Sequence, residues 1–208
     1  KIIILTHTSH IMDLTQTDHF KKKVAIVTGA GQGIGLEICR QLAARGACVL
    51  LNDIEKSLAE EAAYSIQKER GQCIPFVGDA SDIFFIQKMV DEAVKHFGKL
   101  DIAVANAGIT LYGDFFEYKP EDFGQVMKVN LSGSFFLAQA AARQMKEQNS
   151  GGSILFMSSV TGHQAHKNLA AYGMSKAALE MLARTLVLEL SPFNITVNAI
   201  APGATMTE

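Results

Sequence analysis

The sequence predicts a single domain of the α/β class, a doubly wound parallel sheet with helices on both faces. Short apolar runs alternate with longer helical patterns along nearly the whole chain, which is typical of a parallel sheet covered by helices. A glycine-rich turn joins the first run to the first helix, as in sheets that bind dinucleotides. A chain of 208 residues fits one domain and needs no disulfide or metal to fold.

Six apolar runs predict the strands, and helical patterns follow the first five of them. The strands are expected at residues 24–28, 48–52, 74–77, 102–105, 153–157 and 195–200. The helices are expected to begin at residues 33, 55 and 81, near 120, and near 170. In an open sheet of this kind, ligands bind beyond the carboxyl ends of the strands. We therefore look for a site at that edge.

Two of the predicted helices, over residues 123–145 and 170–190, carry apolar side chains nearly all the way round. A helix with this pattern is buried on several sides. We therefore expect each to pack on the sheet with one face and on another subunit with the other. This predicts a homo-oligomer, a dimer or a homotetramer, through the helices that contain Asn130 and Tyr172. The alternative is that some of these faces are exposed alanine.

Composition narrows the class of partner. The formal net charge is −2, and no long basic run is present, which argues against a nucleic-acid partner. The three cysteines show no C-x-x-C spacing and no nearby histidine pair, so we expect no metal site and a reduced, cytoplasmic environment. The apolar run at residues 2–5 is too short for a membrane span or a signal peptide. A small-molecule partner is expected.

Residues 1–22 precede the first predicted strand, and we interpret them as a leader or N-terminal extension in which Met12 is a plausible original start. Residues 23–208 then form the dinucleotide-binding catalytic domain.

The turn after the first strand holds Gly29, Gln32, Gly33, Ile34 and Gly35. Glycines there allow a tight turn, let backbone N–H groups approach a pyrophosphate, and let the helix pack close to the sheet. The spacing is Gly-x-x-x-Gly-x-Gly, which differs from the commoner Gly-x-Gly-x-x-Gly. A helix-capping loop is the alternative. The position after the first strand favours a dinucleotide.

Asp53 stands at the end of the second predicted strand, where a carboxylate can accept hydrogen bonds from an adenosine ribose. The 2′-phosphate of NADP would be repelled there by about 1 to 4 kcal/mol. Neither Gln32 nor Ile54 supplies a compensating cation. We therefore predict NAD rather than NADP. The alternative role for Asp53 is an N-cap of the helix that begins at Glu55.

Tyr172 and Lys176 lie one helical turn apart on the same face. A neighbouring ammonium stabilises a phenolate and so makes a tyrosine useful as a proton donor and acceptor. Tyr64 and Lys68 have the same spacing, but no other catalytic group lies near them in sequence, and we interpret them as a surface pair. Tyr172 differs because two serines, at positions 158 and 159, end the preceding strand at the ligand-binding edge.

From Lys23 onward the sequence resembles the short-chain dehydrogenase/reductase family, whose fold is Rossmann-like. The matching motifs are Thr28-Gly-x-x-x-Gly-x-Gly35, Asp79, Asn106-Ala-Gly108, Asn130, Ser159, Tyr172-x-x-x-Lys176 and Pro202-Gly203. The resemblance implies that Tyr172 is the general acid and base, and that Ser159 orients and polarises the substrate carbonyl. It also implies that Lys176 holds the nicotinamide ribose and makes the phenol more acidic, and that Asn130 supports a water-linked proton relay.

The same resemblance implies the remaining contacts with the cofactor. Asp79 and Ala80 would contact adenine, Asn106 and Gly108 would lie along the cofactor, and Pro202, Gly203 and Thr207 would approach its nicotinamide end.

The sequence departs from the family in two places. Ala105 replaces the first asparagine of the frequent Asn-Asn-Ala-Gly motif, which we expect to have a mild effect. The family continues after Pro-Gly with a lid over the substrate and a last parallel strand, both absent here. We expect a truncated or partly ordered chain.

These observations predict an oxidoreductase that moves a hydride between NAD(H) and a secondary alcohol or ketone, with a sugar or polyol as the favoured substrate. The alternatives are a 3-oxoacyl thioester reductase, an epimerase or dehydratase that holds NAD tightly, and a non-catalytic nucleotide-binding protein on the same fold. The residues that could line the substrate pocket are Thr110, Tyr112, His163, Gln164 and His166, although each is better interpreted as a solvated loop residue.

Overall fold

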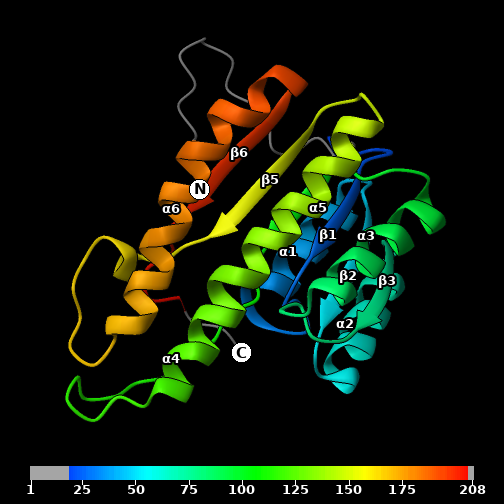
Figure 1. Cartoon of the computed structure of the whole chain (residues 1–208). Helices are drawn as coiled ribbons and strands as arrows, with labels where there is room; N and C mark the ends of the chain where they lie inside the picture. Colours follow the sequence, from blue (N-terminus) through cyan, green and yellow to red (C-terminus); the bar gives the residue numbers. More distant parts are fainter. Residues whose placement is uncertain (1–18, 206–208) are drawn as a thin grey trace.

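The computed structural model describes residues 19–205. Met12, most of the predicted leader and Thr207 lie outside these residues. Within them, six parallel strands form one sheet in the order β3-β2-β1-β4-β5-β6, shown in Figure 1. This is the doubly wound, Rossmann-like arrangement, so the predicted fold class is confirmed. The strands are β1 (Val24–Val27), β2 (Cys48–Asp53), β3 (Gln72–Val77), β4 (Ile102–Ala105), β5 (Gly152–Met157) and β6 (Ile195–Ile200).

Helices cover both faces of the sheet (Figure 1). On one face, α1 and α2 enclose a core with Val27, Val49 and Leu51. On the other, α3, α5 and α6 pack over Ile26, Leu50, Ile154 and Phe156. The central strands β1, β2 and β4 are buried along almost their whole length. Successive side chains of a strand point to opposite faces, so neighbouring residues of one strand belong to different cores. The helices are α1 (Gly33–Ala44), α2 (Lys56–Lys68), α3 (Ile83–Phe97), α4 (Pro120–Val126), α5 (Ser134–Glu147) and α6 (Ala170–Leu190).

Several elements begin one or two residues away from their predicted bounds. Helix α3 begins at Ile83 rather than at residue 81, because the Asp82 side chain accepts hydrogen bonds from the N–H groups of Phe84 and Phe85 and caps the helix. Helix α2 begins at Lys56, with Glu55 as its N-cap.

The long helix predicted from about residue 120 is not one α-helix. It consists of α4, a π-helical segment, η1 (Met127–Gly133), and then α5. Tertiary contacts explain the segment. The side chain of Asn130 donates to Ile109 O at 3.0 Å and accepts from Ile109 N at 2.8 Å. A Cβ atom at Gly133 would lie 2.6 Å from Ala80 O. Wide turns of this kind are frequent at functional sites.

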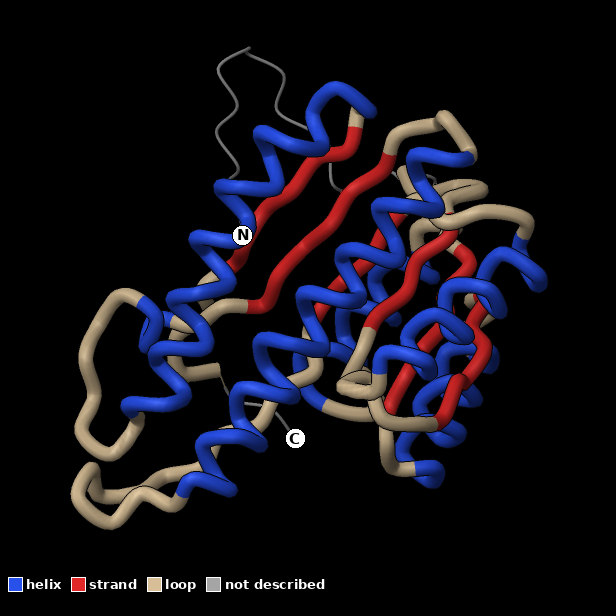
Figure 2. Tube along the Cα trace, in the orientation of Figure 1, coloured by secondary structure: helices blue, strands red, loops and turns tan. Residues whose placement is uncertain are grey.

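Two long loops leave the carboxyl edge of the sheet side by side, after β4 and after β5 (Figure 2). Gly113 N in the first loop donates to Asn168 O in the second at 3.1 Å. The space beyond the ends of β4 and β5 is therefore bordered by both loops, and α6 begins at the end of the second.

Candidate active site

The glycine-rich turn after β1 has the conformation that its glycines predict. Gly29 and Gly33 have φ values of +58° and +59°, which are unfavourable for other residues. A Cβ atom at Gly35 would lie 2.6 Å from Asn106 Nδ2. Asn106 Nδ2 donates to Thr28 O and Gly29 O. The turn is thus fixed against the end of β4, and Asn106 holds it.

The turn leaves an anion-binding helix end available. Gln32 is the N-cap of α1, and its side chain makes no capping hydrogen bond. The first N–H groups of a helix without a side-chain cap attract a phosphate. Gly33, Ile34 and Gly35 are the first residues of this helix, so the residues present fit the pyrophosphate of a dinucleotide.

Asp53 ends β2 beside this turn and is buried, at 9% exposure. Its carboxylate accepts hydrogen bonds from Gly31 N at 2.8 Å and from Glu55 N at 3.0 Å. The N-cap of α2 is Glu55, so Asp53 itself is not the N-cap. It instead joins the glycine turn to the start of α2, and its role with a ribose stays a prediction.

Asp79 and Ala80 follow β3. Asp79 Oδ1 accepts hydrogen bonds from the backbone and hydroxyl of Ser81, and Lys128 Nζ lies 3.7 Å from Asp79 Oδ2. Burial acts to raise the pKa of Asp79, but the bonds from Ser81 and the charge of Lys128 outweigh it and leave the pKa below its ordinary value. Asp79 therefore stays ionised, and Ala80 O packs against Gly133 in η1.

Lys176 is buried at 4% exposure, which is unusual for an ammonium. Its Nζ donates to Met157 O at 2.7 Å and lies 5.6 Å from the centre of the Tyr172 ring. Burial lowers the pKa of Lys176 from its ordinary value to about 8. Within residues 19–205, no carboxylate forms an ion pair with it. A buried cation without a carboxylate partner among these residues thus lies beside the half-buried ring of Tyr172.

Asn130 is fully buried and lies near this pair. A Cβ atom at Gly108 would be 3.3 Å from both Asn130 Oδ1 and Lys176 Nζ. Asn130 Nδ2 also lies 3.1 Å from Ser175 Oγ, a residue that neighbours Lys176 on α6. Gly108, Asn130, Tyr172 and Lys176, distant in sequence, therefore meet at one place.

The two serines follow β5 directly and have different environments. Ser158 Oγ lies 3.0 Å from Lys176 O and 2.8 Å from Glu180 Oε1, so its hydroxyl is held by α6. Ser159 Oγ accepts a hydrogen bond from Thr161 N at 3.2 Å, which leaves its own proton available. Of the two serines, Ser159 is the one whose hydroxyl proton is not directed to α6, and its role with a substrate stays a prediction.

Pro202 and Gly203 follow β6 and lie beside the segment that follows Ser159. Val160 N donates to Pro202 O at 3.0 Å, and a Cβ atom at Gly203 would be 3.9 Å from Val160 Cγ1. The structure thus places the Pro-Gly pair next to the residue that follows Ser159.

Glu180 was not among the predicted site residues, and its neighbour His163 was named only as a residue that could line the substrate pocket. Glu180 Oε1 is 2.8 Å from both Ser158 Oγ and His163 Nε2. A signal was present, because Tyr172, Lys176 and Glu180 are spaced four apart and share one face of α6.

The other candidates for the substrate pocket are exposed loop residues, as expected: Thr110, Tyr112, Gln164 and His166. Tyr64 and Lys68, which share the spacing of the Tyr172 pair, form a surface contact in which Lys68 Nζ lies 4.4 Å from the centre of the Tyr64 ring.

Among residues 19–205, no group of three or more metal-ligating side chains lies close enough together to hold a metal ion. No helix in that part of the chain is long and apolar enough to span a membrane.

Comparison with known proteins agrees with this geometry. The family model described as short chain dehydrogenase matches residues 23–208. An uncharacterized oxidoreductase of Thermotoga maritima is 40% identical over 91% of this chain and 74% of its own length. Versicolorin reductase of Emericella nidulans is 38% identical over 94% of this chain and 74% of its own length.

Among solved structures, NAD⁺-bound xylitol dehydrogenase superposes with a TM-score of 0.86 at 37% identity, covering 89% of this chain and 72% of that one. The family model, the two relatives and this structure all match the domain that carries the glycine turn and the Tyr172–Lys176 pair. The chain belongs to the short-chain dehydrogenase/reductase family of oxidoreductases.

Proposed function

We propose that the protein transfers a hydride between NAD(H) and a secondary alcohol or ketone. The observation that carries the proposal is the buried ammonium of Lys176 beside Tyr172, with one backbone carbonyl as its hydrogen-bond acceptor. A cation in this position stabilises a phenolate, which lets Tyr172 exchange a proton at neutral pH.

Four side chains have distinct tasks in the proposed reaction. During oxidation, the Tyr172 phenolate takes the proton of the substrate hydroxyl, and during reduction it returns the proton to the carbonyl oxygen. Ser159 donates a hydrogen bond to that oxygen and orients it. Lys176 holds the nicotinamide ribose and stabilises the phenolate. Asn130 lines the path by which the proton reaches water. The bound dinucleotide supplies or accepts the hydride.

The dinucleotide would be held by the glycine turn, by the N-terminus of α1, by Asn106 and Gly108, and at its nicotinamide end by Pro202, Gly203 and Thr207. We propose NAD rather than NADP because the buried carboxylate of Asp53 lies beside the turn and would repel a 2′-phosphate. Asp79 and Ala80 would contact the adenine.

The substrate is proposed to be a secondary alcohol, with a sugar or polyol favoured. The similarity to a protein named xylitol dehydrogenase supports a polyol, and the similarity to a protein named versicolorin reductase supports a ketone. No specific contact among residues 19–205 favours the 3-oxoacyl thioester alternative. Against a non-catalytic role stands the grouping of Asn130, Tyr172 and Lys176 at one place.

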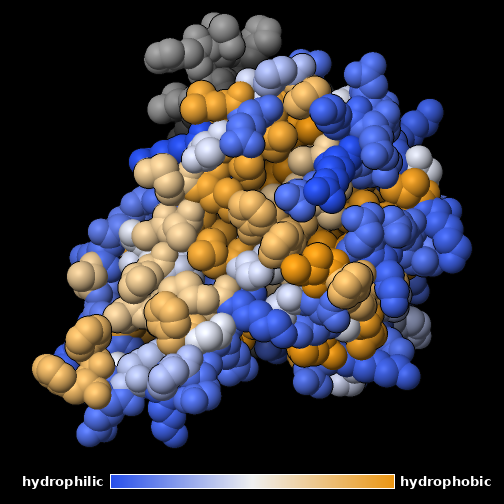
Figure 3. Space-filling view, viewed as in Figure 1, coloured by the Kyte–Doolittle hydropathy of each residue, from blue (hydrophilic) through white to orange (hydrophobic). Residues whose placement is uncertain are grey.

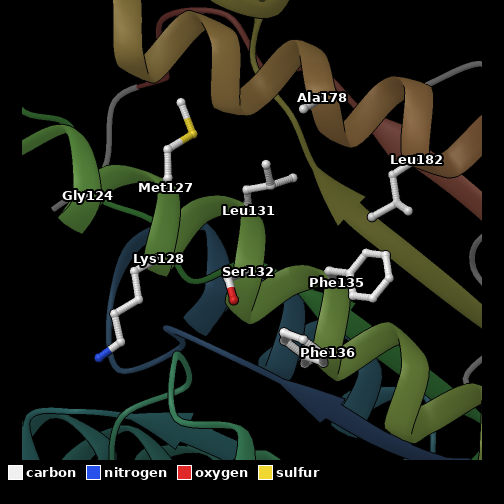
Figure 4. A pocket seen from close by; sticks show the side chains of 9 residues that line it. All are labelled: Gly124, Met127, Lys128, Leu131, Ser132, Phe135, Phe136, Ala178 and Leu182. Carbon is white, nitrogen blue, oxygen red and sulfur yellow. The ribbon is translucent and has the colours of Figure 1, made fainter.

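We also propose that the protein is a homo-oligomer, a dimer or a tetramer, through η1 and α5, which form the predicted helix that contains Asn130, and through α6, which contains Tyr172. Figure 3 shows apolar side chains gathered over these two helices, and on α6 Met174, Met181 and Leu188 are 57%, 60% and 78% exposed. Leu131 and Leu182 point into a hollow between the helices in Figure 4. The hollow is lined by Gly124, Met127, Lys128, Leu131, Ser132, Phe135, Phe136, Ala178 and Leu182. A monomeric mass measured by light scattering would contradict the proposed oligomer.

A cytoplasmic location is proposed from the three free cysteines.

The test is a screen for NADH formation with polyols, sugars, hydroxy acids and 3-hydroxyacyl thioesters, followed by Tyr172→Phe on the best substrate. We expect turnover to fall by orders of magnitude while NADH binding, measured by fluorescence, is retained. Tyr64→Phe is the matched control, because it removes the same hydroxyl from the other pair with this spacing. Turnover of Tyr172→Phe at the level of the unsubstituted protein would disprove the proposal.

A further inference from the structure

The turn that carries Ser159 rests directly on the backbone of α6. This turn, η2 (Val160–Gly162), follows Ser159 without a gap. A Cβ atom at Gly162 would lie 3.1 Å from Ala177 N, and one at Gly173 would lie 3.1 Å from Thr161 O. Glycine at both contacts lets the two backbones approach more closely than side chains would allow. The position of Ser159 relative to Tyr172 therefore depends on how η2 sits on α6.

One carboxylate binds the chain on both sides of η2. Glu180 Oε1 accepts a hydrogen bond from Ser158 Oγ at 2.8 Å and lies 2.8 Å from His163 Nε2. Ser158 precedes the turn and Ser159, and His163 follows them. The Glu180 side chain is only 13% exposed, whereas that of His163 is 56% exposed. A hydrogen bond to a largely buried carboxylate is strong and directed, and the His163 imidazole adds a second contact to the same oxygen atom.

Glu180 belongs to the same face of α6 as the catalytic pair. Lys176 lies one turn earlier, but its Nζ is directed to Met157 O, so it does not compete for the Glu180 carboxylate. Among residues 19–205, the basic side chain within ion-pair distance of Glu180 is that of His163. The carboxylate therefore acts on the turn and not on the ammonium.

We propose that Glu180 is a positioning residue for Ser159. By holding Ser158 and His163 together, it fixes the turn that aims the Ser159 hydroxyl at the substrate oxygen, and it sets the start of the loop that borders the site. The inference rests on the role of Ser159 in the proposed function. A hydroxyl displaced by ~1 Å can lower turnover about 100-fold.

Glu180→Ala and Glu180→Gln test the proposal in the full chain. The alanine variant is expected to lower kcat by about 10- to 100-fold. The Kd of NADH should stay within about twofold of its original value, because the glycine turn proposed to hold the dinucleotide lies between β1 and α1, away from Glu180. The glutamine variant keeps an oxygen acceptor and is expected to recover most of kcat. Glu189→Ala is the matched control, because Glu189 is an exposed glutamate on the same helix, and it should change neither quantity.

A second measurement needs no substrate and therefore stands apart from the proposed function. The N–H groups of Gly162 and His163 donate to Ser159 O and Val160 O within the turn. Hydrogen exchange at these groups should accelerate in Glu180→Ala and not in Glu189→Ala. If no substrate is found but exchange accelerates in this way, the proposed function fails, whereas the conclusion that Glu180 holds the turn in place stands.

Gly162→Ala tests the same contact without changing a charge. The added methyl group would press on Ala177 N and Lys176 C, both at 3.1 Å, and on Glu180 Oε1 at 3.2 Å. It should therefore displace the turn and lower kcat although the Glu180 side chain is retained. The inference is overturned if Glu180→Ala retains kcat within about twofold of the unsubstituted enzyme, or if Glu180→Gln fails to recover kcat. It is also overturned if exchange in the turn is unchanged in Glu180→Ala.

Discussion

Two charged side chains are buried to the same extent at opposite ends of the sheet. Asp101, just before β4 at the amino edge, and Lys176, next to the end of β5 at the carboxyl edge, are each 4% exposed. Asp101 accepts hydrogen bonds from Val24 N at 2.9 Å and from Lys23 and Lys99 Nζ at 3.2 and 3.1 Å. Lys176 has one backbone carbonyl as its acceptor.

The different surroundings have opposite effects on the charged form. Burial acts to raise the pKa of Asp101, but the bonds from Val24, Lys99 and Lys23 outweigh it, and the pKa lies below its ordinary value. Burial lowers the pKa of Lys176 to about 8, against an ordinary value of 10.5. Removing one partner of a compensated buried charge destabilises a fold, whereas buried charges without compensation are concentrated at functional sites. The comparison thus separates structural from functional charges.

Lys176→Met gives the largest expected effect and could break the comparison. Activity should fall by orders of magnitude, because the phenolate loses its neighbouring cation. The free energy of unfolding at pH 7 should be unchanged or up to ~2 kcal/mol higher, because an uncompensated charge is removed. Urea unfolding and a turnover assay measure the two quantities. A large loss of stability would show that Lys176 is structural.

Asp101→Ala tests the other side of the comparison. Removing the carboxylate leaves Val24 N without its acceptor, whereas the partly exposed ammonium groups of Lys23 and Lys99 return to water. The free energy of unfolding should therefore fall by about 1 to 2 kcal/mol. Turnover per folded molecule should stay within about twofold, because Asp101 lies at the edge opposite to the site. A specific loss of kcat in a fully folded variant would contradict the assignment.

The pH dependence of stability should distinguish the two charges. The folded pKa of Lys176 is depressed, so its destabilising effect is complete below about pH 8 and disappears as the pH rises toward 10.5. Relative to Lys176→Met, the unsubstituted protein should therefore gain up to about 3 kcal/mol over this range. The ordinary pKa of Asp101 is 3.8, and its pKa in the folded protein is lower. The stability that its carboxylate contributes is therefore fully present above pH 3.8 and is lost as the pH falls through the pKa of the folded state. Parallel urea titrations would refute this if the difference from Lys176→Met were constant.

Asp53→Asn tests a buried charge whose surroundings are intermediate between those of Asp101 and Lys176, and it has the smallest expected effect on activity. Asp53 is a buried anion at the carboxyl edge, and it is bound by backbone N–H groups rather than by cations. Asparagine keeps an acceptor for Gly31 N but removes the charge that would repel a 2′-phosphate. The ratio of kcat/KM for NAD to that for NADP should fall about tenfold, equivalent to ~1.4 kcal/mol. An unchanged ratio would show that Asp53 serves only the turn.

Sequence patterns predicted the parts of the molecule that local rules determine. The alternation of strands and helices was sufficient for the doubly wound sheet, and the glycine spacing was sufficient for the turn at Gly29 and Gly33. The Tyr172–Lys176 pair could be separated from Tyr64–Lys68 because two serines precede it at the ligand-binding edge. The clamp of Glu180 on Ser158 and His163 was missed, because it depends on which loop folds over α6.

The wide turn η1 was missed for a similar reason, since its cause lies in Ile109 and Ala80, on loops far away in sequence. The apolar pattern of residues 123–145 was interpreted as continuous around one helix. A π-helical turn takes up more residues than an α-helical one. The apolar side chains before η1 and those after it therefore do not continue along one face of a single regular helix.

A wide turn also makes the site sensitive to chain length. Each residue of an α-helix advances the direction of its side chain by about 100°. Deleting one residue between Val126 and Ser134 would allow a regular helix to form from α4 to α5, but Asn130 or the apolar face of α5 would then point elsewhere. Insertions and deletions in this short stretch, which barely alter hydropathy or helix propensity, are therefore constrained as tightly as substitutions of the reactive side chains.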